Sequence, residues 1–332
     1  MKSQSGDASA TGTFTGLAPG AAASTAISVG IDTSTAGAKS GGVSLAFVSD
    51  AGAGGVAGLP DQAISVAGTV YRKADAALVP ISEIVHVGDP GTARISVSNN
   101  STPDGFSESL IAALLGGSAG IGIATPGPTG DILAGASDTS SLGISFSTAQ
   151  AGTIVGTATV GLTSDGGTGA SSIDGLGQSA LPDQSVAVNI TVDNFANSKI
   201  TSDGNLTSTG TNSFKLDLGS TLQGSAALLA NLSSLNDVVG PADSLSGTAM
   251  TSGDSEFSNT GFGALGTVDA GALLTLGKVE LSTSTAGVFT ETVTLTPTDS
   301  NTSGFSEALA PQIVTVSARS SQPPPRWATC TW

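Results

Sequence analysis

Apolar and polar residues alternate with a period of two along most of the chain. The pattern is clearest at residues 43–47, 64–70, 95–97, 186–192, 214–218 and 293–295. Because successive side chains on a β-strand point to opposite faces, each run predicts a strand with one face on a core and the other in water. Gly, Asp, Asn and Ser bound these runs, as is typical of turns between strands. The pattern therefore predicts an all-β fold of β-sandwiches.

One segment, Phe106–Gly117, leaves two interpretations open. Its Leu110, Ala113 and Leu114 fit one face of a helix. The related segment Gly304–Gln312 leads directly into a strand pattern, so a strand that ends in a loop is the alternative.

The phrase LPDQ occurs twice, at Leu59–Gln62 and Leu181–Gln184, each time before an alternating run. The surrounding blocks, Leu17–Tyr71 and Leu133–Asp193, also share spaced Ala-Gly and Ser-Asp pairs, and a short insertion in the second block marks a loop. A weaker third copy, Val268–Ala318, contains the degraded phrase LAPQ. A period of about 115–135 residues is too long for a solenoid turn and indicates tandem domains.

These copies predict tandem Ig-like β-sandwich repeats, the first of them truncated. The predicted boundaries are 1–79 for a partial repeat, 80–195 for a complete repeat, 196–319 for a diverged repeat and 320–332 for a disordered tail, with a linker at Ala74–Pro80. The tail contains Pro323–Pro325, which cannot pair in a sheet. The first repeat has no counterpart of Ile81–Ala119, so we expect it to expose a sheet edge that invites pairing with another chain.

Two long phrases, Val85–Leu110 (VHVGDPGTARISVSNNSTPDGFSESL) and Gly12–Gly41 (GTFTGLAPGAAASTAISVGIDTSTAGAKSG), carry a family resemblance. They resemble the choice-of-anchor D type β-strand repeats of large proteobacterial surface proteins, including PEP-CTERM-sorted and autotransporter-like ones. The resemblance covers residues 8 to 318. It implies Ig-like sandwiches, extracellular exposure and a spacer or adhesive role, and it supplies no catalytic residues.

Targeting segments are not evident in the sequence. It shows no secretory signal, no C-terminal sorting segment and no apolar stretch of about 18 residues that would span a membrane. The extracellular or cell-surface location is therefore implied by the resemblance alone, and we expect the chain to be a fragment of a longer array.

Composition narrows the range of partners. The chain has 26 Asp and Glu against 10 Lys and Arg, a net charge of −16 that disfavours nucleic acid and anionic lipid. Only 11% of residues are charged, and Ser, Thr and Gly are plentiful, so extracellular polysaccharide or other surface proteins are the expected partners. The single cysteine, Cys330, excludes an intrachain disulfide. The sequence leaves the oligomeric state open.

Catalytic chemistry finds little support. His86 is the only histidine and is expected on a surface or edge strand. One His and one Cys cannot make a His-based zinc site. Gly120–Gly130 lacks the lysine of a phosphate loop, and no carboxylate pair is flanked by aromatic residues, as a glycosidase would need. We expect no catalytic residues and no enzyme.

Four aspartates lie beside glycines or polar residues in predicted turns: Asp50, Asp165, Asp89 and Asp203. Asp-Gly pairs are typical of tight turns, because Asp tolerates turn conformations and Gly supplies positive φ. Oxygen-rich loops also bind Ca²⁺, although none of these matches the EF-hand spacing. The four residues are therefore weak metal candidates, with Ca²⁺ as the only cofactor considered. The alternative function is a Ca²⁺-dependent carbohydrate-binding β-sandwich.

Overall fold

The computed structural model describes residues 2–23, 25–168 and 173–324. These residues form β-strands and one short 3-10 turn at Gly52–Gly54, so the predicted all-β class is confirmed. Within the described ranges, no helix has the length and hydropathy that crossing a membrane requires.

The chain groups into two compact units. The first comprises the described parts of Met1–Pro80, Thr92–Ser145 and Thr157–Ala187. The second comprises the described parts of Ile81–Gly91, Phe146–Gly156 and Val188–Trp332. The repeat boundaries expected from the sequence, at 79/80, 195/196 and 319/320, stay predictions.

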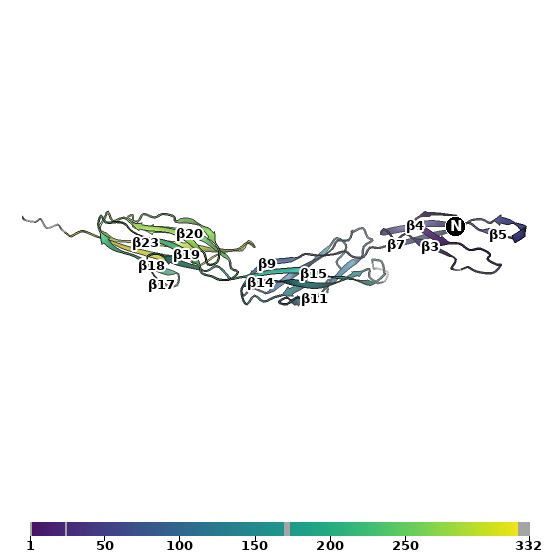
Figure 1. Cartoon of the computed structure of the whole chain (residues 1–332), viewed down its shortest axis with the longest axis horizontal. Helices are drawn as coiled ribbons and strands as arrows, with labels where there is room; N and C mark the ends of the chain where they lie inside the picture. Colours follow the sequence, from purple (N-terminus) through teal and green to yellow (C-terminus); the bar gives the residue numbers. More distant parts are fainter. Residues whose placement is uncertain (1, 24, 169–172, 325–332) are drawn as a thin grey trace, which may run out of the picture. The chain divides into compact units, whose positions relative to one another are not determined.

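Strands of the first unit form several small ladders (Figure 1). One three-stranded sheet has the order β1 (Ser3–Gly6), β4 (Gly37–Leu45), β7 (Gln62–Val70). Two-stranded pairs are β2 (Ala8–Gly12) with β3 (Ile27–Ile31), and β5 (Val48–Asp50) with β6 (Val56–Gly58). A further sheet has the order β12 (Gly122–Thr125), β13 (Ser137–Ser145), β10 (Thr92–Asn99), β8 (Ala76–Leu78), and β11 (Ser109–Gly117) pairs with Ala158–Asp165 of β14 (Gly152–Asp165).

The second unit contains two sheets that share one core. The smaller sheet has the order β16 (Ser198–Ser202), β19 (Leu228–Asn236), β22 (Leu273–Leu281). The larger has the order β17 (Asn205–Gly210), β18 (Ser213–Leu222), β25 (Gln312–Ser321), β23 (Gly287–Ser300), β20 (Ser244–Gly253), β21 (Gly263–Val268), with β24 (Ser306–Ala308) paired to β23. Leu232 and Leu276 of the smaller sheet and Val293 and Val316 of the larger are fully buried in one cluster. Alternate residues of facing sheets thus make a β-sandwich core.

A parallel ladder also belongs to the second unit. β9 (Ile81–His86) runs parallel to Val188–Asp193 of β15 (Gln178–Asp193), with Asp193 opposite His86.

The ambiguous segment Phe106–Gly117 contains a strand, β11, rather than a helix. Leu110, Ala112 and Leu114 are buried at alternate positions, and the strand pairs antiparallel with β14. Long-range pairing decided between two patterns that the local sequence supports equally.

Two expectations at segment ends need revision. Ala74–Pro80, expected to be a linker, contains β8, whose residues 76–78 pair with Val97–Asn99 of β10. β25 continues to Ser321, two residues into the predicted tail, because its backbone pairs with both β18 and β23. Residues 325–332 of that tail lie outside the described residues.

Candidate functional site

The end of strand β9 places His86 in a tight backbone turn of the second unit. His86 N–H donates to Asp89 Oδ2 at 2.7 Å, and Asp89 N–H donates to the His86 carbonyl at 3.0 Å. Thr148 Oγ1 donates to the Asp89 carbonyl at 2.7 Å, which fixes the turn from the other side. Only 6% of His86 is exposed, so the prediction of a surface histidine was wrong, although β9 is an edge strand as expected.

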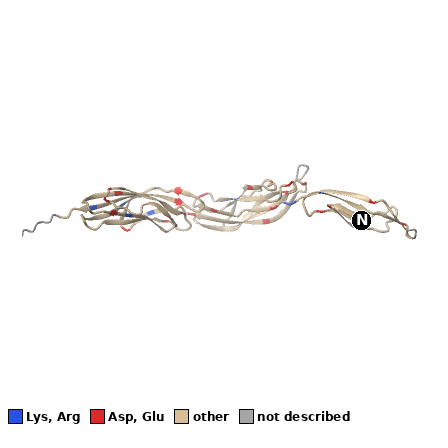
Figure 2. Ribbon diagram, turned by 90° about the horizontal axis from the view of Figure 1, so that it is seen from above, with Lys and Arg blue, Asp and Glu red and all other residues tan. Residues whose placement is uncertain are grey.

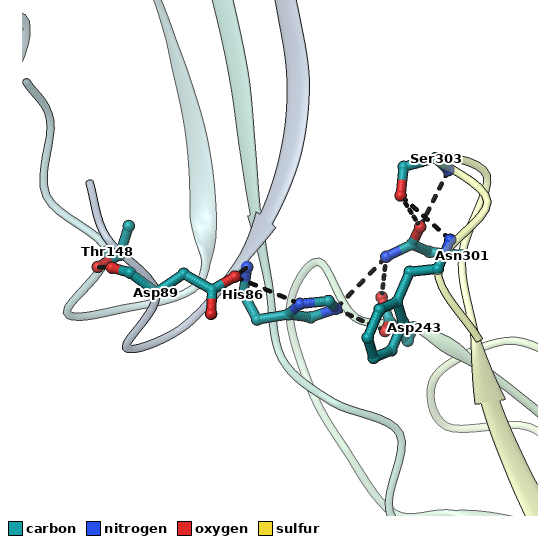
Figure 3. Close-up of polar contacts among 7 residues, drawn as sticks. His86, Asp89, Thr148, Asp243, Asn301 and Ser303 are labelled. Carbon is teal, nitrogen blue, oxygen red and sulfur yellow. Dashed lines mark hydrogen bonds and ion pairs between the residues drawn. The ribbon is translucent and has the colours of Figure 1, made fainter. Parts of the chain in front are cut away.

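Both nitrogens of the His86 ring face carboxylates (Figure 3). Nε2 lies 2.8 Å from Asp243 Oδ2, and Nδ1 lies 3.5 Å from Asp89 Oδ2. Asn301 Nδ2 donates to the second oxygen of Asp243 at 2.9 Å. Both oxygens of the buried Asp243 carboxylate therefore have partners.

Two aromatic rings pack against this imidazole. The Phe195 ring stacks on His86 with centroids 4.2 Å apart and an interplanar angle of 13°. Phe305 approaches with its centroid at 4.4 Å and a tilt of 56°.

Three aspartates meet around this histidine: Asp193, Asp243 and Asp299, which are 6%, 1% and 0% exposed. Burial raises the pKa of Asp299 to about 6, and the charge of Asp243 adds to the rise, against the opposing effects of the Ala196 amide and His86. Burial also raises the pKa of Asp193, with Asp243 again contributing. The Ala196 amide lies near Asp299 and lowers its pKa without a well-formed hydrogen bond, because neither carboxyl oxygen has a partner at hydrogen-bond geometry among the described residues.

The loop that follows β23 contributes the remaining contacts. Asn301 Oδ1 accepts hydrogen bonds from the Ser303 N–H and from Ser303 Oγ, at 2.9 and 2.6 Å. This turn presents the Asn301 amide nitrogen to Asp243 (Figure 3). The cluster thus joins three segments that are remote in sequence: the end of β9, the residue before β20, and the turn after β23.

These contacts make the cluster structural. The hydroxyls of Thr148 and Ser303 donate to the Asp89 carbonyl and to Asn301 Oδ1, not to the imidazole. Nucleophilic catalysis needs a hydroxyl or thiol within hydrogen-bond reach of a base, and the ring nitrogens of His86 face carboxylates instead. What the arrangement can do is hold three segments together, through His86, Asp243 and Asn301.

Two of the predicted metal candidates, Asp50 and Asp165, lie in the first unit at the ends of β5 and β14. Asp50 Oδ1 accepts the Gly52 N–H at 2.7 Å. Asp165 Oδ1 accepts the Gly167 N–H at 2.7 Å, and its other oxygen accepts from Gln178 Nε2 at 2.7 Å. Each carboxylate therefore closes an Asx turn of the kind that the Asp-Gly pattern indicates.

The other two candidates, Asp89 and Asp203, lie in the second unit. Asp89 belongs to the His86 turn. Asp203 accepts from both the backbone N–H and the side-chain Nδ2 of Asn231, at 2.7 Å each, and these bonds hold its pKa below the usual value. Within residues 2–23, 25–168 and 173–324, no three His, Cys, Asp or Glu side chains are arranged to hold a metal ion.

A second feature of the second unit is a face rich in hydroxyl groups. Outward positions of β23 are occupied by five threonines at alternate residues: Thr290, Thr292, Thr294, Thr296 and Thr298. Thr292 lies opposite Thr315 of β25 and Ser252 of β20, and Thr296 lies opposite Thr248. Directly opposite residues of neighbouring strands point to the same face. The sheet therefore presents rows of hydroxyls across three strands, here called the threonine face.

Charged side chains are sparse over the described chain, and Figure 2 shows Lys and Arg as isolated blue segments. Beside the threonine face, Lys215 of β18 lies opposite Thr315 and Asp217 opposite Ser317. Arg319 of β25 lies opposite Val288 of β23, and Asp254 Oδ2 accepts the Thr290 N–H at 2.7 Å, so charged groups border the hydroxyl rows on more than one side.

Sequence reasoning missed Asp193, Asp243, Asp299 and Asn301 as members of a cluster. A signal existed for Asp299, which follows Val293, Leu295 and Pro297 in the core-facing register of β23. A carboxylate at a core position is expensive unless it has a special role. For Asp243 and Asn301 the local sequence gives no such signal, because both lie outside the strands.

Comparisons with known proteins identify no family. No family model matches the chain, and no curated protein matches it. Among solved structures, it is similar to CfaE, the adhesive subunit of the CFA/I fimbria of enterotoxigenic Escherichia coli (10% identity, 76% of this chain and 90% of that chain, TM-score 0.27). It is also similar to mouse protocadherin-24 EC1-3 (13% identity, 93% of this chain and 89% of that chain, TM-score 0.29). A third similar structure is that of fibronectin(III)-like modules of Clostridium thermocellum CbhA (14% identity, 75% of this chain and 95% of that chain, TM-score 0.22). Because these TM-scores are low, the all-β assignment rests on the strand ladders of this chain.

Proposed function

We propose that this chain is a non-catalytic structural or adhesive region of a bacterial extracellular or cell-surface protein, built from tandem Ig-like sandwich repeats. It acts as a spacer and contacts extracellular polysaccharide or neighbouring surface proteins. The threonine face carries this proposal. A row of alternate threonines on a sheet, with hydroxyls of the adjacent strands beside it, offers repeated donors and acceptors to a polyhydroxylated chain.

The His86 cluster supports the mechanical part of the proposal. In this cluster the only histidine of the chain connects β9 to Asp243, and Asp243 in turn binds Asn301 in the turn after β23. Removing one partner of a buried hydrogen bond leaves the other polar group without a partner, which typically costs about 1–3 kcal/mol. Such a fastening suits a module that transmits force between its ends.

The test of the contact surface uses the whole chain and a panel of insoluble polysaccharides such as cellulose, chitin and cross-linked alginate. We expect the chain to co-sediment with at least one of them and Thr292→Glu to weaken binding about tenfold, because a charge displaces the hydroxyl row. The matched control is Thr211→Glu, at an exposed position in the turn between β17 and β18, outside the three strands of the threonine face. Equal effects of both substitutions, or no binding by the unmodified chain, would contradict the proposed contact.

The same preparation tests the absence of catalysis. We expect no turnover of glycoside or ester substrates, with or without His86→Ala. Turnover that disappears in His86→Ala would show that the imidazole is catalytic and would overturn the proposal.

A further inference from the structure

Strand β7 in the first unit has a neighbour on one edge only. It pairs antiparallel with β4 along its whole length, from Gln62 opposite Leu45 to Val70 opposite Gly37. Over residues 2–23, 25–168 and 173–324, no strand pairs with its other edge. Alternate backbone N–H and C=O groups of β7 therefore point away from the sheet, which makes this edge a template for pairing.

β7 begins at the last residue of the phrase LPDQ. Two other strands contain this phrase or begin at the end of its degraded form LAPQ, and both have neighbouring strands on two sides. β15 contains LPDQ at Leu181–Gln184 and lies between β14 and β9. β25 starts at the last residue of LAPQ, Gln312, and lies between β23 and β18. In both cases one of these neighbours, β9 or β18, runs parallel. Strands β7, β15 and β25 thus share a local sequence, but only β7 lacks the parallel neighbour.

Burial follows the same division. The core-facing residues Val188, Ile190 and Val192 of β15 are 1%, 0% and 1% exposed. The core-facing residues Val314, Val316 and Ala318 of β25 are 0%, 0% and 3% exposed. The corresponding β7 residues are uncovered: Ile64 is 39% exposed, and Val66 and Val70 are only half-buried. An apolar row that is buried in two strands and open in the third indicates that β7 is built for a cover that the described residues do not supply.

We propose that the free edge of β7 binds an extended polypeptide strand in parallel orientation, in the position that β9 takes beside β15 and β18 takes beside β25. Its ligand is a segment of about six residues with apolar side chains at spaced positions, like Ile81, Ile84 and Val85 of β9. Main-chain hydrogen bonds supply affinity, and the open row Ile64, Val66 and Val70 selects apolar side chains. β7 has no charged residue, so it does not repel such a segment. This inference is independent of the proposed contact with polysaccharide, because it concerns another unit and another surface.

The test adds a synthetic peptide of the sequence VPISEIVHVGDP, residues 79–90, to the whole chain and follows amide hydrogen exchange of residues 62–70. We expect exchange of the outward-pointing β7 amides to slow at least tenfold at saturating peptide. The control peptide carries Glu83→Pro and Val85→Pro, which remove two donors and prevent pairing. We expect this control peptide to leave the amide exchange of residues 62–70 unchanged.

Two variants of the chain localise the binding. Ile64→Lys places a charge in the open apolar row and is expected to abolish protection. Ala63→Lys places the same charge on the opposite face of β7 and is expected to leave it intact, so a general effect of lysine on folding is separated from an effect on binding. Circular dichroism confirms that both variants keep their strand content.

Three outcomes overturn the proposal. The first is unchanged exchange of residues 62–70 with the peptide. The second is protection of all β7 amides in a dilute monomer without peptide, which would mean that the edge is not free. The third is protection that rises with protein concentration together with a doubled mass in sedimentation, which would assign the edge to a second copy of the chain.

Discussion

At the scale of single residues, Asp299 is the group whose ionisation depends most on its surroundings. It lies in the core-facing register of β23, is fully buried, and has no hydrogen-bond partner among the described residues. Burial, together with the charge of Asp243, raises its pKa from 3.8 to about 6. The folded chain therefore binds a proton at Asp299 more tightly than the unfolded chain does.

This difference predicts how stability depends on pH. Between pH 4 and 6 the folded state holds more protons at Asp299 than the unfolded state, so the free energy of unfolding falls as pH rises through this window. The contribution is fully present below the unfolded pKa and is lost above about pH 6. We expect Asp299→Asn to remove the dependence and to be more stable than the unmodified chain at pH 7.5 by about 1–3 kcal/mol, because the amide is neutral.

Urea unfolding at pH 4.0, 5.0, 6.0 and 7.5 measures this effect, with the exposed Asp183→Asn as the matched control. The two variants should differ at pH 7.5 and converge with the unmodified chain near pH 4. An Asp299→Asn protein that is less stable than the unmodified chain at pH 7.5 would show that the carboxylate has a stabilising partner, contrary to this account.

At the scale of elements, the strands depend on a few irregular positions. β20 shifts its register against β21 between Leu245 and Gly247. Gly247 has φ +155, and a Cβ at this position would clash with the Thr296 carbonyl oxygen of β23. Only glycine allows the two backbones to approach in this way.

Substitution of this glycine tests the role of the bulge. We expect Gly247→Ala to lower the free energy of unfolding by about 1–3 kcal/mol, since backbone must move to accommodate the methyl group. Gly266→Ala in the paired strand β21 is the control, because a Cβ there meets nothing within 4 Å. Chemical denaturation of both variants decides the matter, and equal stabilities would mean that the bulge relaxes freely.

The strands themselves were largely predictable, and the reason is visible in β25. Val314, Val316 and Ala318 are buried at alternate positions, as the period of two requires. Phe106–Gly117 shows the limit of that reasoning. Its nearly continuous apolar run fits a helix or a strand, and the pairing of β11 with β14 resolves it.

At the scale of the whole molecule, the acidic turns test whether the fold needs a cation. Asp50, Asp165, Asp89 and Asp203 each accept hydrogen bonds from backbone or side-chain donors of the chain. Donors within the chain thus already serve these carboxylates, so we expect Tm to differ by less than about 2 °C between 5 mM CaCl₂ and 5 mM EDTA. Differential scanning calorimetry provides the measurement. A large rise of Tm in calcium would show that the turns bind the ion after all and would revive the Ca²⁺-dependent alternative.

Local sequence is sufficient to predict the all-β class, because side-chain alternation is a property of each strand alone. It also pointed to the turn aspartates, since an Asx turn spans only two residues. The His86 cluster, in contrast, becomes visible only in the folded chain. Its partners Asp243 and Asn301 lie 157 and 215 residues away, and no local pattern encodes which loops meet after the sheets have paired. Likewise, the open edge of β7 became evident only when the strands beside β15 and β25 were known, because an edge is a property of a sheet and not of a strand.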